Sequence, residues 1–235
     1  MPARRQAAYD RTMSVLNTLD TAAAVPAAVA SFLRGVERRA ATLAGLQCGD
    51  PEQGDRALTA AIEAFMDAAP HSPHGDWPLL FWTTLLQSPA LNAEPLAPFW
   101  HGDFAPLARL DFGTRAVILL RVVVGLNDAQ AATVFEVDPA EYKLALQRAM
   151  PQRADGSMDG EAWLALNDEA RFVMQHMPPE RVACIARLRD AAIADGATTR
   201  SRVSAPSSRC RRAGTWSHAV ACGLRPGCGG HGAGS

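Results

Sequence analysis

The sequence predicts an all-α protein in which two small helical domains are joined by a short linker. The second domain is a helix-turn-helix, and a C-terminal helical pair and a disordered tail follow it. Hydrophobic residues make up 48% of the chain, and most of them are Ala and Leu, which favour helices. They recur at intervals of three and four residues, the spacing of one helix face. Only two Tyr are present and no stretch alternates apolar with polar residues, so strands are not expected.

Residues 1–92 are predicted to form the first domain. Residues 14–47 carry apolar side chains at helical spacing and predict one or two helices. The next helix begins after Asp50, which can cap it, with Pro51 in the first turn and Gln53 at the capping-box position. The stretch APHSPHGD ends that helix, and WPLLFWTTLLQS supplies the last helix of the domain. The aromatic residues of WPLLFW are interpreted as core, with stacking on a nucleic acid as the alternative.

A Pro-rich stretch, residues 93–108, is predicted to be the linker, and residues 109–150 a compact three-helix unit. A support helix around Arg115 ends at Gly125, and Asn127 can cap the short helix that follows. Asp138 begins a second capping box, and its helix runs to about Met150. Two short helices joined by a tight corner are the layout of a helix-turn-helix.

The second helix of this unit has two different faces. Its apolar positions, expected to pack on the support helix, are Tyr142, Leu146 and Ala149. Its outward positions are Glu141, Lys143, Leu144, Gln147 and Arg148. In a DNA-binding helix-turn-helix, this outward face enters the major groove.

Residues 151–195 are predicted to be a helical extension, with a helical pair within residues 159–194. This pair is expected to pack on the helix-turn-helix, with a partner surface or an autoinhibitory element as the alternatives. Residues 1–195 contain all 24 acidic residues and 17 of the 23 basic residues, whereas residues 196–235 contain six Arg and no acid. The latter segment is predicted to be a disordered basic tail. Its composition is also typical of translation in a different reading frame of a GC-rich gene.

Three stretches within residues 107–150 resemble the extracytoplasmic-function sigma factors of bacterial RNA polymerase. Residues 110–120, LDFGTRAVILL, follow that family's Leu-Pro…Arg-x-Val-x-Leu-Leu pattern. Residues 125–132, GLNDAQAA, follow Gly-Leu-Ser…Glu-Ile-Ala, and residues 142–149, YKLALQRA, follow Val-Lys-x-Arg-Leu-x-Arg-Ala. The resemblance implies promoter binding through the helix-turn-helix, with contacts from Asn127, Lys143, Leu144, Gln147 and Arg148.

The first domain resembles the core-polymerase-binding domain of the same family. An acidic helix with a Gln-Glu-x-x-Phe-like core precedes a Trp-containing helix there, and Glu63, Phe65 and Trp82 are the matching positions. The resemblance implies that Glu63 and Phe65 contact core RNA polymerase. It also implies an opposing anti-sigma protein as a further partner.

The sequence departs from the family at several positions that matter for binding. Glu136 stands at the corner where the family has Gly, Ala145 replaces an Arg and Glu141 replaces a Thr. No Lys or Arg lies between Arg56 and Arg109, on a surface that would normally hold a displaced DNA strand with basic and aromatic residues. These departures favour an alternative hypothesis, a sigma-like regulatory or protein-interaction module with little or no DNA binding.

The remaining patterns indicate no enzyme, cofactor or metal site. The chain has no Gly-rich phosphate loop, nucleophile elbow or H-E-x-x-H motif. His71 and His74 are interpreted as solvated turn residues, with a metal or acid-base cluster as the alternative. The tail cysteines and histidines match no paired C-x-x-C framework. No apolar run is long enough to span a bilayer, so a cytoplasmic protein is expected.

Overall fold

In the computed structural model the described residues are 27–93 and 97–202. The all-α prediction is confirmed, since the described residues form helices and no β-strand beyond an isolated bridge between Gln152 and Met158. Predictions for residues 1–26 and 203–235, which include most of the predicted tail and its cysteines, lie outside the described residues. Within the described ranges, no helix combines the length and apolarity needed to cross a bilayer.

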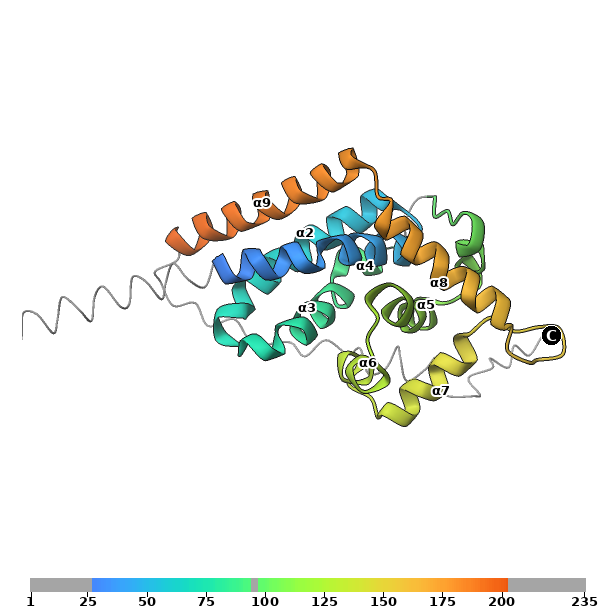
Figure 1. Cartoon of the computed structure of the whole chain (residues 1–235). Helices are drawn as coiled ribbons and strands as arrows, with labels where there is room; N and C mark the ends of the chain where they lie inside the picture. The colour runs from blue at the N-terminus through green and yellow to red at the C-terminus, as the bar shows by residue number, and fades with distance from the viewer. Residues whose placement is uncertain (1–26, 94–96, 203–235) are drawn as a thin grey trace, which may run out of the picture.

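The predicted first domain folds into a set of packed helices (Figure 1). Its elements are an N-terminal helix (residues 27–48), α2 (Pro51–Ala68), η1 (Ala69–His71), η2 (His74–Asp76), α3 (Trp77–Leu86) and α4 (Pro89–Asn92). Asp50 caps α2 as expected, because its Oδ1 accepts the Glu52 amide proton at 2.9 Å. Gln53 does not complete a capping box. It is buried and donates instead to the Ala90 carbonyl, which ties α2 to α4.

The core of this region is a cluster of aromatic rings. Phe65 and Phe81 are 0% exposed, and their ring centroids lie 5.5 Å apart in an edge-to-face arrangement. Trp77 packs edge-on against Phe65, and its indole N–H donates to the Ala69 carbonyl at 3.2 Å. Trp82 is also buried, at 3% exposure. The interpretation of WPLLFW as core is confirmed, so these rings are not exposed stacking faces.

The second half of the chain is also helical. Its elements are η3 (Gly102–Arg109), α5 (Phe112–Leu119), the π-helical turn η4 (Leu120–Val124), α6 (Asp128–Phe135), α7 (Pro139–Ala149), α8 (Gly160–Gln175) and α9 (Pro179–Arg202). The support helix is formed by α5 and η4 together. Gly125 ends it with φ 79°, a left-handed conformation that glycine adopts without steric cost.

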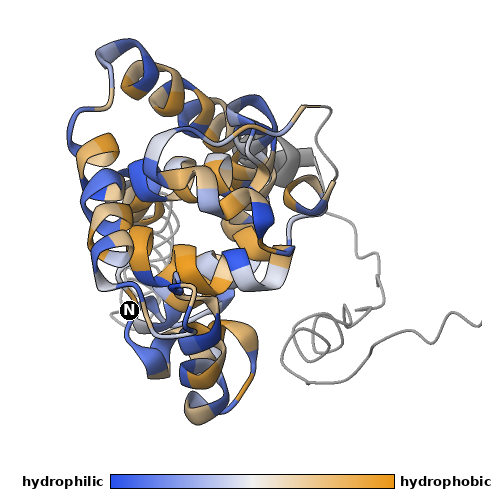
Figure 2. Cartoon of the chain, turned by 90° about the vertical axis from the view of Figure 1, so that its right-hand side faces the viewer, coloured by the Kyte–Doolittle hydropathy of each residue, from blue (hydrophilic) through white to orange (hydrophobic). Residues whose placement is uncertain are grey.

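The two halves share one hydrophobic core. Arg115 of α5 donates to the Gln47 carbonyl at 2.6 Å and to two carbonyls of the preceding segment. Gln47 donates back to the Phe112 carbonyl at 2.9 Å. Within the segment expected to be a linker, Phe104 and Leu107 are buried. Figure 2 shows hydrophobic residues gathered on segments that face the middle of the molecule. The division into separate domains therefore stays a prediction.

The C-terminal helical pair divides between the two halves. Helix α8 packs against η3 and η4, next to the helix-turn-helix, whereas α9 lies along α2 (Figure 1). The expected packing on the helix-turn-helix thus describes α8 and not α9. The backbone of α9 continues to Arg202, beyond Gly196, where the sequence predicts that regular structure ends.

Candidate functional site

The helix-turn-helix begins with a complete capping box at Asn127. Its Oδ1 accepts the Gln130 amide proton at 2.9 Å, and the Gln130 side chain accepts the Asn127 amide proton at 3.1 Å. The expected cap is confirmed. Because the Asn127 carboxamide oxygen is used by the cap, a DNA contact from this residue would come from its NH₂ group.

The corner between α6 and α7 is formed by Glu136. This residue has φ 57° and ψ 39°. Among the described residues, it is the only one other than glycine that has a positive φ. Its amide donates to the Thr133 carbonyl at 3.2 Å, and the Val137 amide donates to Ala132 at 3.0 Å. A left-handed conformation at a non-glycine residue costs roughly 1 kcal/mol. The corner therefore has the helix-turn-helix geometry despite the missing glycine.

Helix α7 is fixed by its buried face. Tyr142 is 1% exposed, and its hydroxyl donates to the Val117 carbonyl of α5 at 3.0 Å. Burial raises the pKa of this hydroxyl well above its ordinary value, and the Asp128 carboxylate adds to the rise. Leu146 and Ala149 are buried beside it, as predicted. Asp138 caps α7 through the Ala140 amide, so the capping box predicted with Glu141 is not formed.

The opposite face of α7 is exposed. The outward residues are, as predicted, Glu141, Lys143, Leu144, Gln147 and Arg148, with Leu144 46% exposed. This face offers two cations, one amide and one apolar side chain, which are the groups that contact phosphates and base edges. Residues 125–150 nevertheless contain four acids and two bases. The net charge of this segment is therefore negative, and both of its basic residues lie on α7.

The two residues predicted to contact polymerase lie in different environments on α2. Glu63 is exposed, whereas Phe65 is 0% exposed and packs against Phe32, Trp77 and Phe81. Phe65 thus stabilises the core and offers no surface to a partner. Of the predicted pair, Glu63 alone lies at the surface.

Helix α9 occupies the side of α2 next to Glu63. The Arg181 guanidinium donates to both carboxylate oxygens of Asp55 at 2.5 Å. Hydrogen bonding to Asp55 raises the pKa of Arg181 above its ordinary value. About two helical turns further along α9, Leu188 borders a shallow hollow of the α2 surface that also includes Glu63 and Thr59. The predicted polymerase-binding surface is therefore flanked by a helix of the same chain.

A second ion pair ties α9 to the N-terminal helix. Arg189 donates to Glu37 at 2.5 Å, and the two side chains are 9% and 11% exposed. Desolvation acts to lower the pKa of Arg189, but the Asp190 and Glu37 carboxylates together outweigh it and raise the pKa. Neither ion pair was predicted from the sequence. The readable signal was the spacing of Arg181, Ile185, Leu188 and Ala192, which marks the inner face of α9.

No cluster that could hold a metal ion is formed in the described part of the chain. There, no group of three or more His, Cys, Asp or Glu side chains is close enough to hold a metal ion. The His74 ring packs edge-on against Trp77, with centroids 4.2 Å apart, and His71 is exposed. Comparison with known proteins adds no family, since no family model, curated protein or solved structure matches the chain.

Proposed function

We propose that this chain is a sigma-like protein of bacterial transcription initiation, which binds promoter DNA through α7 and core RNA polymerase through α2. The observation that supports the proposal is the geometry of α7. Its inner face is anchored by Tyr142, Leu146 and Ala149, and its exposed face carries Lys143, Gln147 and Arg148. The protein acts by recruitment, with no bond chemistry and no cofactor, and it acts in the cytoplasm.

The chemistry of the α7 face sets the strength of DNA binding. Gln147 can read an adenine edge, and Lys143 and Arg148 can contact phosphates or guanine. Two phosphate contacts give a salt slope of about −1.8, so affinity falls roughly tenfold between 50 and 200 mM salt. Glu141 faces the same phosphates and weakens the complex further.

The test is binding of the full chain to a library of double-stranded promoter DNA, measured by fluorescence anisotropy at both salt concentrations. The double variant Lys143→Ala, Arg148→Ala is expected to lose the salt-dependent part of the affinity. The control, Arg171→Ala with Arg187→Ala, removes the same charge from exposed positions of α8 and α9. Equal affinity of the wild type and the α7 double variant would show that α7 does not hold the DNA.

A second candidate function is favoured by the position of α9. Because Arg181 and Leu188 lie beside the exposed Glu63 side of α2, α9 competes with a polymerase contact that extends from Glu63 toward Asp55. In this candidate the chain is a regulatory module, and a partner must displace α9 before α2 can bind. The anti-sigma-like interaction that the family resemblance implies is then replaced by a contact within the chain.

Binding of core polymerase to the full chain separates the two candidates. Arg181→Glu places a carboxylate against Asp55 and loosens α9, whereas Arg187→Glu makes the same charge change on the exposed side of α9. Polymerase binding and transcripts with the wild type support the initiation factor. Binding by Arg181→Glu alone supports the regulatory module. No binding by either protein excludes a polymerase contact through α2.

A further inference from the structure

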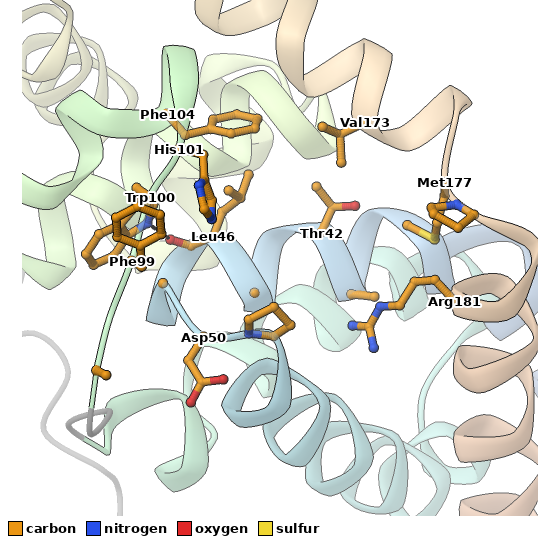
Figure 3. Close-up of a pocket in the computed structure, with 16 residues that line it drawn as sticks. Thr42, Leu46, Asp50, Phe99, Trp100, His101, Phe104, Val173, Met177 and Arg181 are labelled. Carbon is orange, nitrogen blue, oxygen red and sulfur yellow. Dashed lines mark hydrogen bonds between the residues drawn. The ribbon is translucent and has the colours of Figure 1, made fainter.

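A cavity of about 420 Å³ lies where three segments distant in sequence meet. They are the N-terminal helix, residues 97–104, and the junction of α8 with α9 (Figure 3). Its walls include Leu46, Phe99, Trp100, Phe104, Val173 and Met177. The volume falls in the range of small-molecule sites, roughly 300–1,000 Å³.

The space exists because one face of the N-terminal helix and the turn after it carry small residues. Ala41, Gly45 and Gly49 follow one another at intervals of four, and all three line the cavity. The cavity is therefore built into the sequence of the helix and does not depend on a displaced side chain.

The aromatic wall is held in place by hydrogen bonds and packing within the protein. The Trp100 indole N–H donates to the Leu46 carbonyl at 2.6 Å, and the Arg115 guanidinium lies 4.5 Å from the centre of the Trp100 ring. The ring packs so closely on Gly49 that a Cβ at that position would lie 2.7 Å from it. The Phe99 amide donates to the Gly49 carbonyl at 2.7 Å. A wall fixed in this way is preformed for a ligand.

Three polar side chains around the cavity are already bonded within the protein, and a fourth, His101, is exposed and packs its ring edge-on against Phe99. The Thr42 hydroxyl donates to the Arg38 carbonyl at 2.9 Å, Asp50 caps α2, and Arg181 is paired with Asp55. Among the described residues, the buried side-chain atoms without a partner are Gln47 Oε1 and Ser88 Oγ, and neither residue lines the cavity. The site therefore offers apolar contact and has no unpaired buried group that selects a charged ligand.

We propose that this cavity binds a small, uncharged aromatic molecule. Ring surfaces from Phe99, Trp100 and Phe104 favour an aromatic ligand, because offset and edge-to-face ring contacts add to the burial of apolar area. The ligand also touches Met177 and Arg181, at the start of α9. Binding thus stabilises the junction from which α9 runs along α2. This site is separate from the DNA face of α7, and it shares Arg181 with the contact between α9 and α2.

The test is titration of the full chain with N-phenyl-1-naphthylamine, an uncharged aromatic probe whose fluorescence rises in apolar surroundings. We expect saturable binding of one probe per chain and a higher melting temperature with the probe. Val173→Phe and Gly45→Leu each fill the cavity, and each is expected to weaken binding at least tenfold. A Cβ at Gly45 meets its nearest atom at 3.8 Å, so the first atom of the new side chain is accommodated without a clash.

Gly35→Leu is the matched control. Gly35 lies on the same helix but does not line the cavity, and a Cβ at this position would have no atom within 4 Å. The control variant is expected to bind the probe like the wild type. Circular dichroism shows whether each of the two cavity-filling variants folds. If one does not fold, the probe affinity of the other tests the proposal. The proposal is overturned if the wild type shows no saturable binding or if a folded filled variant binds equally well. If the anion 1-naphthalenesulfonate binds with the same affinity as the uncharged probe, the proposal that the ligand is uncharged is overturned.

Discussion

Replacing Arg189 by Met tests whether α9 is a fixed part of the fold. Arg189 and Glu37 lie on helices distant in the sequence, and their side chains are 9% and 11% exposed. The substitution keeps most of the length of the side chain and removes its charge. Glu37 then stays in a largely buried position without its cation, while Asp190, which is 68% exposed, is solvated by water.

The expected loss follows from this geometry. Removing one partner of a buried ion pair costs about 3–5 kcal/mol, because the remaining charge is not compensated. We expect the lower end, about 3 kcal/mol, since Glu37 retains some contact with water. For a chain of this size the loss corresponds to a fall in melting temperature of roughly 6–12 °C.

Urea denaturation followed by circular dichroism measures the effect. The double variant Arg189→Met, Glu37→Met removes both charges and is expected to regain most of the loss, because an apolar replacement of a buried pair is close to neutral. The control is Arg171→Met, which removes an exposed pair with Asp168 at 62% and 68% exposure. Exposed pairs contribute about 0–1 kcal/mol. Equal losses for Arg189→Met and Arg171→Met would refute the packing of α9 described here.

Three further predictions concern individual residues. Glu136→Gly is expected to raise the free energy of unfolding by about 1 kcal/mol, because it relieves a φ of 57°, whereas Glu136→Ala gives no such gain in urea denaturation. Tyr142→Phe is expected to lower it by about 1 kcal/mol through loss of the 3.0 Å bond to Val117, and an unchanged value would contradict that bond. Burial, followed by the Asp50 carboxylate, raises the pKa of Cys48 from 9.0 to about 11. The folded state then binds the Cys48 thiol proton more tightly than the unfolded state does. The resulting gain in the free energy of unfolding is fully present below about pH 9 and is lost between about pH 9 and 11. Cys48→Ala should reduce this loss, as measured by urea denaturation at pH 8 and 10.5.

The sequence predicted the features that depend on neighbouring residues. The cap at Asn127 and the two faces of α7 follow from contacts within four or five positions. Local rules of capping and helix periodicity apply at that range. The fold class and the helix-turn-helix face were therefore predictable.

The features that depend on distant residues were not predictable. The Asp55–Arg181 and Glu37–Arg189 pairs join positions 126 and 152 residues apart, and no periodic pattern states which helices will meet. Phe65 is a different case, because helical spacing places it on the apolar face of α2 and the family resemblance alone assigned it to a surface. The cavity depends on the meeting of three segments. The spacing of apolar residues identifies the buried face of a helix, but only tertiary packing determines which helix that face contacts.

The interactions that keep α9 packed on α2 are different from the buried-charge penalty that Arg189→Met measures. When α9 leaves, both members of each ion pair return to water, so the pairs contribute little to its retention. The retaining contribution is apolar burial, mainly of Ile185 and Ala192, each 1% exposed, with a part from Leu188. Burial of this kind amounts to about 4 kcal/mol, which leaves roughly one chain in a thousand with α9 released. A partner that needs the covered side of α2 therefore binds about a thousandfold more weakly than its intrinsic affinity. A partner that contacts only the exposed side around Glu63 meets no such penalty, so the effect of Arg181→Glu on polymerase affinity reports which side of α2 is used.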